Sequence, residues 1–137
     1  MLVALVLLWL LGPFTVPPAQ AADDRIDCEN AASTYEINIC AERAFEAADA
    51  RLNAVYKQAL GAITEMAVAE KPYDAASWEA ALRASQRAWV AFRDAECNRH
   101  VAMFWSGGSG ATADILGCMT TMTKTRADEL AERYEIE

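Results

Sequence analysis

The chain has 137 residues and a formal net charge of −8 at pH 7, from 20 acidic and 12 basic side chains. Its length suits one domain rather than several. The negative charge argues against nucleic acids and anionic membrane surfaces as partners, because phosphate binding requires clusters of basic side chains. It favours a cationic partner, or it serves solubility alone.

The N-terminal stretch is typical of a cleaved signal peptide. An uncharged and almost wholly apolar run over residues 1–11 leads to Ala19-Gln20-Ala21, the small-x-small pattern that signal peptidase cuts. No basic residue precedes the run, which departs from the usual pattern. The run is about half the roughly 20 residues that span a bilayer as a helix, so a membrane anchor is the weaker interpretation. We expect a signal peptide over residues 1–21.

The expected mature domain, residues 22–137, contains all four cysteines. An even number of cysteines in a small exported chain indicates two disulfides and a periplasmic or secreted location. No small-residue box precedes Cys28, so we expect no lipid anchor. A zinc site needs closer and more numerous ligands than these cysteines and the single histidine, His100, provide. We therefore expect neither a metal nor a cofactor.

Strong helix formers dominate the mature domain, and no alternating strand pattern persists. Three long segments carry apolar residues at helical spacing. The first begins at Ser33, which with Glu36 has the signature of a capping box, and ends at Lys71-Pro72, because the residue before proline avoids helical geometry. Its expected apolar stripe comprises Tyr35, Ile39, Phe45, Leu52, Tyr56, Leu60 and Ile63.

The second segment is capped by Asp74 or Ser77, and the third starts at Thr112, which Asp114 follows closely. Between the two lies a clear break of small residues: Ser106, Gly107, Gly108, Ser109 and Gly110. The expected stripe of the second segment comprises Trp78, Leu82, Trp89 and Phe92, with Met103 and Phe104 as further candidates. That of the third comprises Ile115, Met119, Met122, Leu130 and Tyr134.

The spacing of the cysteines favours one disulfide pairing. Cys97 and Cys118 each lie about ten residues from the middle of the glycine-rich break, so they face each other in an antiparallel helical hairpin. Cys28 and Cys40 then pair and fold the extended N-terminal segment over the first helix. The two other pairings remain open. The expected fold is all-α, an antiparallel bundle of three main helices with a short extended segment and two disulfides.

Four blocks of residues carry a family resemblance. They are Cys28…Thr34-x-Glu36-x-x-x-Cys40, then Asp49-x-x-Leu52-Asn53-x-x-Tyr56, then Gln86-x-x-Trp89-x-x-Phe92-Arg93-Asp94-x-x-Cys97, and finally Cys118 with Thr125-Arg126-x-x-x-Leu130. Together they resemble the N-terminal domain of the LprI-type lysozyme inhibitor family, over about residues 28–134. The resemblance implies an exported helical domain that inhibits lysozyme, the glycosidase that cuts peptidoglycan.

Arg93 has two possible roles, as a buried member of an ion pair or as a residue that contacts a partner. It lies one turn from Trp89 on the apolar face, so we expect it to be partly buried and paired with a carboxylate, Glu36 or Asp49. Adjacent helical residues diverge by about 100°, so Arg93 and Asp94 need not act together. Direct contact with a partner is the less favoured role. The expected structural network comprises Glu36, Asp49, Asn53, Gln86, Arg93, Asp94 and Arg126.

Candidate chemistry is sparse. His100 is expected on a helix surface, and no activated nucleophile or acid–base pair can be assembled, so we do not expect an enzyme. The segment Ser106–Thr112 is small, polar and braced at its base by the expected Cys97–Cys118 bond. It could enter a cleft through Ser106, Gly107, Gly108, Ser109 and Gly110, although a plain connection between helices is the favoured interpretation.

Two functions follow from these observations. The leading one is an exported protein that binds lysozyme and covers its peptidoglycan-hydrolysing cleft, and a basic lysozyme would attract a chain of charge −8. The alternative is a non-enzymatic module of the cell envelope that binds another cationic or peptidoglycan-associated partner. A third possibility, a small hydrolase, lacks a site.

Overall fold

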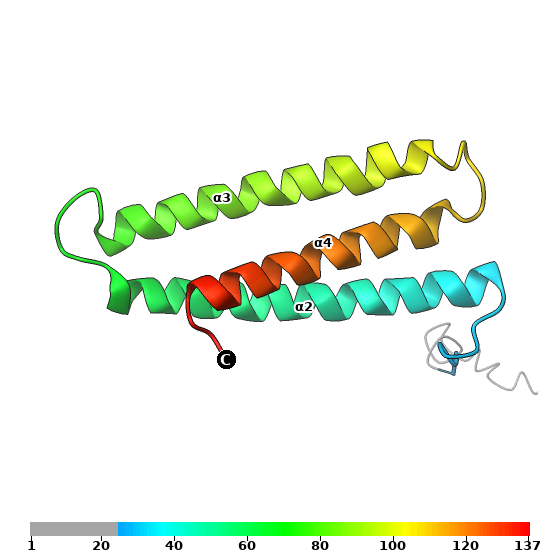
Figure 1. Ribbon diagram of the computed structural model, residues 1–137, viewed down its shortest axis with the longest axis horizontal. Helices are drawn as coiled ribbons and strands as arrows, with labels where there is room; N and C mark the ends of the chain where they lie inside the picture. The colour runs from blue at the N-terminus through cyan, green and yellow to red at the C-terminus, as the bar shows by residue number, and fades with distance from the viewer. Residues whose placement is uncertain (1–24) are drawn as a thin grey trace, which may run out of the picture.

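The structure, a computed structural model, describes residues 25–137, and the expected signal peptide over residues 1–21 lies outside them. It contains three long helices: α2 (Thr34–Met66), α3 (Ala75–Ala95) and α4 (Ala111–Arg133). A single π-helical segment, η1 (Glu96–Val101), continues α3. No strand occurs among these residues. Helix α3 runs opposite to α2 and α4 (Figure 1), which confirms the predicted all-α bundle.

The start of α2 is fixed by the predicted capping box. The Ser33 hydroxyl accepts a hydrogen bond from the Glu36 backbone N–H at 3.2 Å, and the Glu36 carboxylate accepts one from the Ser33 N–H at 2.9 Å. The Ser33 hydroxyl and the Ala32 N–H donate to the same carboxylate. These hydrogen bonds, the one from the Ser33 backbone above all, hold the pKa of Glu36 below its ordinary value.

The predicted end of this helix at Lys71-Pro72 is wrong. Helix α2 ends at Met66, and Ala67 takes an extended conformation. The proline rule sets only an outer limit, since it restricts Lys71 alone. The last buried residue of α2 is Ile63, and beyond Ala67, which packs against the core, residues 68–73 are exposed and hold no further helical turn in place.

The other two helix starts lie close to the predicted positions. Of the two candidate caps for α3, Asp74 is the N-cap, and its carboxylate accepts the Ser77 N–H at 2.9 Å. Helix α4 begins at Ala111, one residue before Thr112, and its N-cap Gly110 offers no side-chain hydrogen bond. A one-residue difference is within the ordinary fraying of helix ends.

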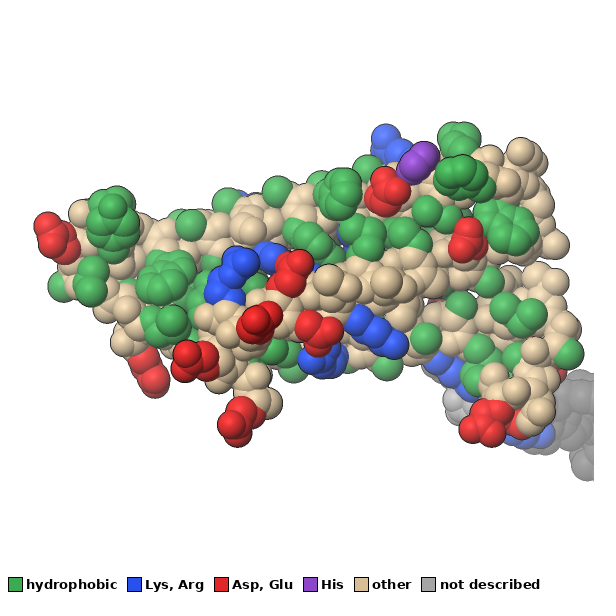
Figure 2. Space-filling model, in the orientation of Figure 1, with side chains coloured by type: hydrophobic (Ala, Val, Ile, Leu, Met, Phe, Trp, Pro, Cys, Tyr) green, Lys and Arg blue, Asp and Glu red, His purple; other side chains and the backbone are tan. Residues whose placement is uncertain are grey.

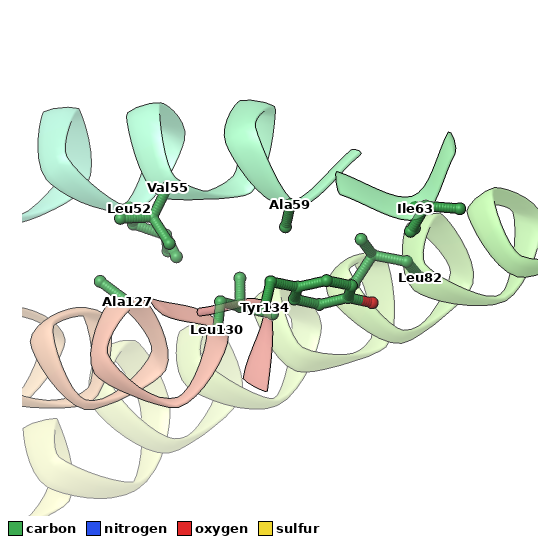
Figure 3. Packing of buried hydrophobic residues seen from close by; sticks show 8 residues of the cluster. All are labelled: Leu52, Val55, Ala59, Ile63, Leu82, Ala127, Leu130 and Tyr134. Carbon is green, nitrogen blue, oxygen red and sulfur yellow. The ribbon is translucent and has the colours of Figure 1, made fainter. Parts of the chain in front are cut away.

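The apolar core lies between the second half of α2, the start of α3 and the end of α4 (Figure 3). Helices α2 and α4 form the most extensive contact, and α3 contacts both of them more sparsely. The buried residues of α2 recur every three or four positions, which keeps them on one face. The core comprises Leu52, Val55, Ala59, Ile63, Leu82, Ala127, Leu130 and Tyr134.

Several residues expected in the apolar stripes are exposed instead. Tyr35 lies in the first turn of α2, and Phe92, Met103 and Phe104 lie at the end of α3 or beyond η1. The interior position near the end of α3 is occupied by Arg93, and its neighbour Phe92 therefore points outward, about 100° away around the helix. Met103 and Phe104 follow the π-helical segment, where the chain turns out of the helix.

Both predicted disulfides are confirmed. Cys28 bonds Cys40 and Cys97 bonds Cys118, each with Cα atoms 5.6 Å apart. Arg43 also holds the N-terminal segment, since its guanidinium donates to the Ile26 carbonyl at 3.0 Å. No helix within residues 25–137 is long and apolar enough to span a membrane.

The two disulfides lie at one end of the bundle and the apolar core lies toward the other. The start of α2 and the α3–α4 connection meet at the same end (Figure 1). We call this the hairpin end: residues 25–46, 92–118 and their disulfides. The buried side chains within it are Arg93 and Cys97, and those next to it are the small or polar Ala48, Thr120 and Thr123. Covalent bonds therefore hold the end in which little apolar surface is buried.

Candidate functional site

Arg93 lies at the junction of the three helices and is only 7% exposed. Its guanidinium carbon stands 5.4 Å from the centre of the Phe45 ring and 5.3 Å from that of the Trp89 ring. Both distances are within cation–π range. The guanidinium thus lies between an aromatic ring of α2 and one of α3. The sparse contact between these two helices leaves room for it.

The charge of Arg93 is balanced by two carboxylates. The guanidinium donates twice to Asp94, at 2.9 and 3.0 Å, and lies 3.7 Å from Asp49 on α2. It also donates to the buried Thr123 hydroxyl of α4 at 3.2 Å. Asn53 donates to Asp49 and orients it. Although adjacent helical positions diverge, the long arginine side chain bends back to reach Asp94.

A second buried arginine, Arg126, ties α4 to α3. Its guanidinium donates to Gln86 at 3.1 Å, to Ser85 at 3.3 Å and to Glu129 at 3.1 Å. The structure therefore divides the expected network into two clusters, one around each arginine. Glu36 belongs to neither, because it stays in the capping box at the start of α2.

The loop between α3 and α4 is held by a tryptophan that the sequence analysis did not single out. The Trp105 indole donates to the Asp114 carboxylate at 2.8 Å. Its ring covers Gly110 so closely that a Cβ atom at that position would overlap it. Ser106 and Gly107 adopt positive φ angles of 45° and 83°, so the loop turns sharply. The loop is exposed but anchored at both ends.

Hydrophobic side chains gather on the surface of the hairpin end (Figure 2). His100 lies among them on the helix surface, as expected, and its Nδ1 lies 2.9 Å from the Glu96 carboxylate. Its ring centre is 5.4 Å from that of Phe104. No feature of the sequence distinguished the exposed Phe92, Met103 and Phe104 from a buried stripe.

A shallow groove of about 300 Å³ lies between α2 and α3 and is lined by Tyr56, Arg83, Gln86, Arg87 and Val90. Within the described part of the chain, no three His, Cys, Asp or Glu side chains are arranged to hold a metal ion. The features left for binding a partner are therefore the exposed α3–α4 loop and the exposed hydrophobic side chains of the hairpin end.

Comparison with known proteins gives two matches. Residues 28–130 match the family described as lysozyme inhibitor LprI. An uncharacterized protein of Rhizobium meliloti (strain 1021) is 37% identical over 121 residues, which cover 86% of this chain and 86% of that protein. No solved structure matches.

Proposed function

The chain belongs to the LprI lysozyme inhibitor family, and from this premise we propose that it is an exported, non-enzymatic inhibitor that binds lysozyme and blocks its peptidoglycan-hydrolysing cleft. The family match over residues 28–130 carries the proposal. That range contains both disulfides, helices α2 and α3 and nearly all of α4, so the match concerns the whole bundle rather than a fragment.

An extracytoplasmic location agrees with the covalent structure. Both cysteine pairs are bonded, and such bonds persist in the periplasm or outside the cell, where lysozyme acts on the wall. The expected signal peptide over residues 1–21 would provide the export route.

Charge supports a basic lysozyme as the partner. The chain carries a net charge of −8, and opposite net charges accelerate encounter between proteins. Carboxylates are also dense on the last turns of α4 and the C-terminal tail. After Arg126, five carboxylates face a single basic residue, Arg133. The five carboxylates are Asp128, Glu129, Glu132, Glu135 and Glu137.

The exposed α3–α4 loop is the candidate for cleft entry. Glycosidases of this type cut between two carboxyl groups, and the hydroxyls of Ser106 and Ser109 could donate hydrogen bonds to such groups. The anchoring of the loop by Trp105 supports this role, because a pre-ordered loop loses less conformational entropy on binding.

A turbidity assay tests the proposal. A suspension of bacterial cell walls clears when a basic lysozyme is added, and the oxidised chain of residues 22–137 should slow this clearing in proportion to its concentration. An unrelated acidic helical protein of similar charge controls for non-specific binding. Replacing Ser109 with Tyr tests cleft entry separately, and unchanged inhibition by that variant would remove the loop from the interface.

The second candidate is a cell-envelope module that binds another cationic or peptidoglycan-associated partner. The acidic surface at the end of α4 favours it, since such a surface would attract a basic protein of any activity. Clearing that proceeds normally at low salt, where attraction is strongest, would contradict the inhibitor proposal and leave this candidate.

A further inference from the structure

We propose that the apolar side chains exposed at the hairpin end form the surface that docks the basic glycosidase partner, with Met103 and Phe104 at its centre. This inference rests on the proposed function and names the contact residues for it. It differs from cleft entry by the serine and glycine loop, because it assigns the main contact to large apolar groups beside that loop.

Exposed hydrophobic residues are distributed unevenly over the molecule. Among residues 25–137, nine large hydrophobic side chains are exposed, and six of them belong to the hairpin end. Met103 and Phe104 are the most exposed of all, at 74% and 75%. The six are Tyr35, Ile37, Phe92, Met103, Phe104 and Trp105. Met103, Phe104 and Trp105 are consecutive in the chain and all exposed; neighbouring exposed apolar groups mark interaction sites, and aromatic residues and methionine are enriched in protein interfaces.

This surface is held in place by neighbouring contacts. The Phe104 ring lies beside the His100 ring, which in turn contacts the Glu96 carboxylate. Trp105 is fixed by its hydrogen bond to Asp114. The disulfide from Cys97 to Cys118 joins the two sides of the hairpin below them. A surface that is ordered before binding loses less entropy on association, so its apolar contacts contribute more to affinity.

Charges around the apolar centre indicate the chemistry of the partner. The N-terminal segment and the first turns of α2 place five carboxylates at the hairpin end against two arginines, Arg25 and Arg43. These five carboxylates are Asp27, Glu29, Glu36, Glu42 and Glu46. The basic residues nearest to Met103 and Phe104 in sequence are Arg99 and His100. The hairpin end as a whole carries more carboxylates than arginines, and this net acidic charge fits a basic protein better than an anionic membrane.

The test compares substitutions at the two ends of the bundle. The double variant Met103→Ala/Phe104→Ala removes the proposed centre, and Tyr73→Ala removes a side chain of similar exposure, 67%, from the α2–α3 connection at the opposite end. Calorimetric titration with a basic lysozyme should show at least about a tenfold loss of affinity for the double variant and less than about a twofold change for Tyr73→Ala. Circular dichroism should be the same for all three proteins.

Each other outcome overturns the inference in a distinguishable way. If the unmodified chain inhibits lysozyme and the double variant inhibits equally well, the docking surface lies elsewhere and the proposed function stands. If the unmodified chain does not bind lysozyme, both fail. If it sediments with phosphatidylglycerol vesicles, or forms a dimer in the ultracentrifuge, and the double substitution abolishes that behaviour, the surface serves a membrane or a second copy instead.

Discussion

Arg93 is nearly buried, yet its two carboxylate partners are not. The side chains of Asp94 and Asp49 are 44% and 43% exposed. Removing the guanidinium would therefore leave no carboxylate buried without a partner, and the full penalty for an orphaned buried charge does not apply. What would be lost is the contact with the two aromatic rings and the hydrogen bond to the buried Thr123 hydroxyl.

We therefore expect Arg93→Ala to lower the free energy of unfolding by about 2 kcal/mol, the combined scale of a partly desolvated cation–π contact and one unsatisfied buried hydroxyl. Arg93→Lys keeps the charge but not the planar guanidinium, and its free energy of unfolding should lie between those of the parent and of Arg93→Ala. Urea unfolding followed by circular dichroism measures both. An unchanged midpoint for Arg93→Ala together with lost lysozyme binding would make Arg93 a contact residue instead.

Replacing glycine with alanine should change the free energy of unfolding in opposite directions at Gly110 and Gly61. A Cβ atom at Gly110 would overlap the Trp105 indole, so Gly110→Ala should detach the ring and lower the unfolding free energy. At Gly61, within α2, a Cβ atom meets nothing within 4 Å, so Gly61→Ala should raise it by about 0.5–1 kcal/mol. Thermal melting distinguishes them, and a stabilising Gly110→Ala would show that the indole does not hold the loop.

At the scale of the helices, the sequence predicted most of the fold because the signals are local. The capping box at Ser33, the break at residues 106–110 and the cysteine spacing each depend on a few neighbouring residues, and the structure agrees with all three. The predicted end of α2 was less accurate, because a helix ends where its tertiary contacts end, and these are not local.

The candidate surface could not be predicted in the same way. Exposed Phe92, Met103 and Phe104 have the same helical spacing as a buried stripe, and only the packing of α3 against its neighbours decides which face is inside. A π-helical segment such as η1 has no compositional signal. The partners of Arg93 and Arg126 depend on contacts between helices. The sequence therefore predicted some members of the network, such as Asp49 and Gln86, but it included Glu36, missed Thr123 and did not give the division into two clusters.

The capping box gives α2 a measurable pH dependence. The pKa of Glu36 is lowered in the folded chain by its hydrogen bonds to the Ser33 and Ala32 backbone, so its contribution to stability is present above the unfolded-state pKa and is lost as the pH falls through the lowered value. We expect Glu36→Gln to be less stable than the parent at pH 7, with the difference shrinking as the pH falls below the ordinary pKa of a glutamate. A difference that stays constant as the pH falls would show that the carboxylate charge is not responsible.

The two disulfides should differ in their response to reduction. Cys97 is fully buried, whereas Cys28 is exposed, so a thiol reductant should open Cys28–Cys40 first. Alkylation followed by mass spectrometry records the order. Replacing Cys97 and Cys118 with Ser should lower the unfolding free energy by roughly 3 kcal/mol, because the bond closes a loop across the hairpin. Because the apolar core lies toward the other end of the bundle, we expect the variant to keep most of its helical signal, and a complete loss of that signal would contradict this expectation.

For the molecule as a whole, the charge of −8 predicts how binding depends on salt. Attraction between net charges acts on the approach of the two proteins, and its range shrinks to about 8 Å at physiological ionic strength. Raising the salt concentration should therefore slow association with a basic lysozyme more than it speeds dissociation. Stopped-flow fluorescence measures both rates. A dissociation rate that carries most of the salt effect would indicate that contact ion pairs, rather than steering, hold the complex.

The opposite placement of disulfides and core has a consequence for when the protein can act. In a reducing compartment the core end could still collapse around Leu52, Ile63 and Leu130, while the hairpin end would lack the bonds that join its segments. A newly made chain would then have a folded core that resists proteolysis, but its hairpin end would not yet be ordered for binding a partner. If the proposed export takes place, oxidation outside the cytoplasm would complete the surface, and the proposed binding would then depend on the compartment.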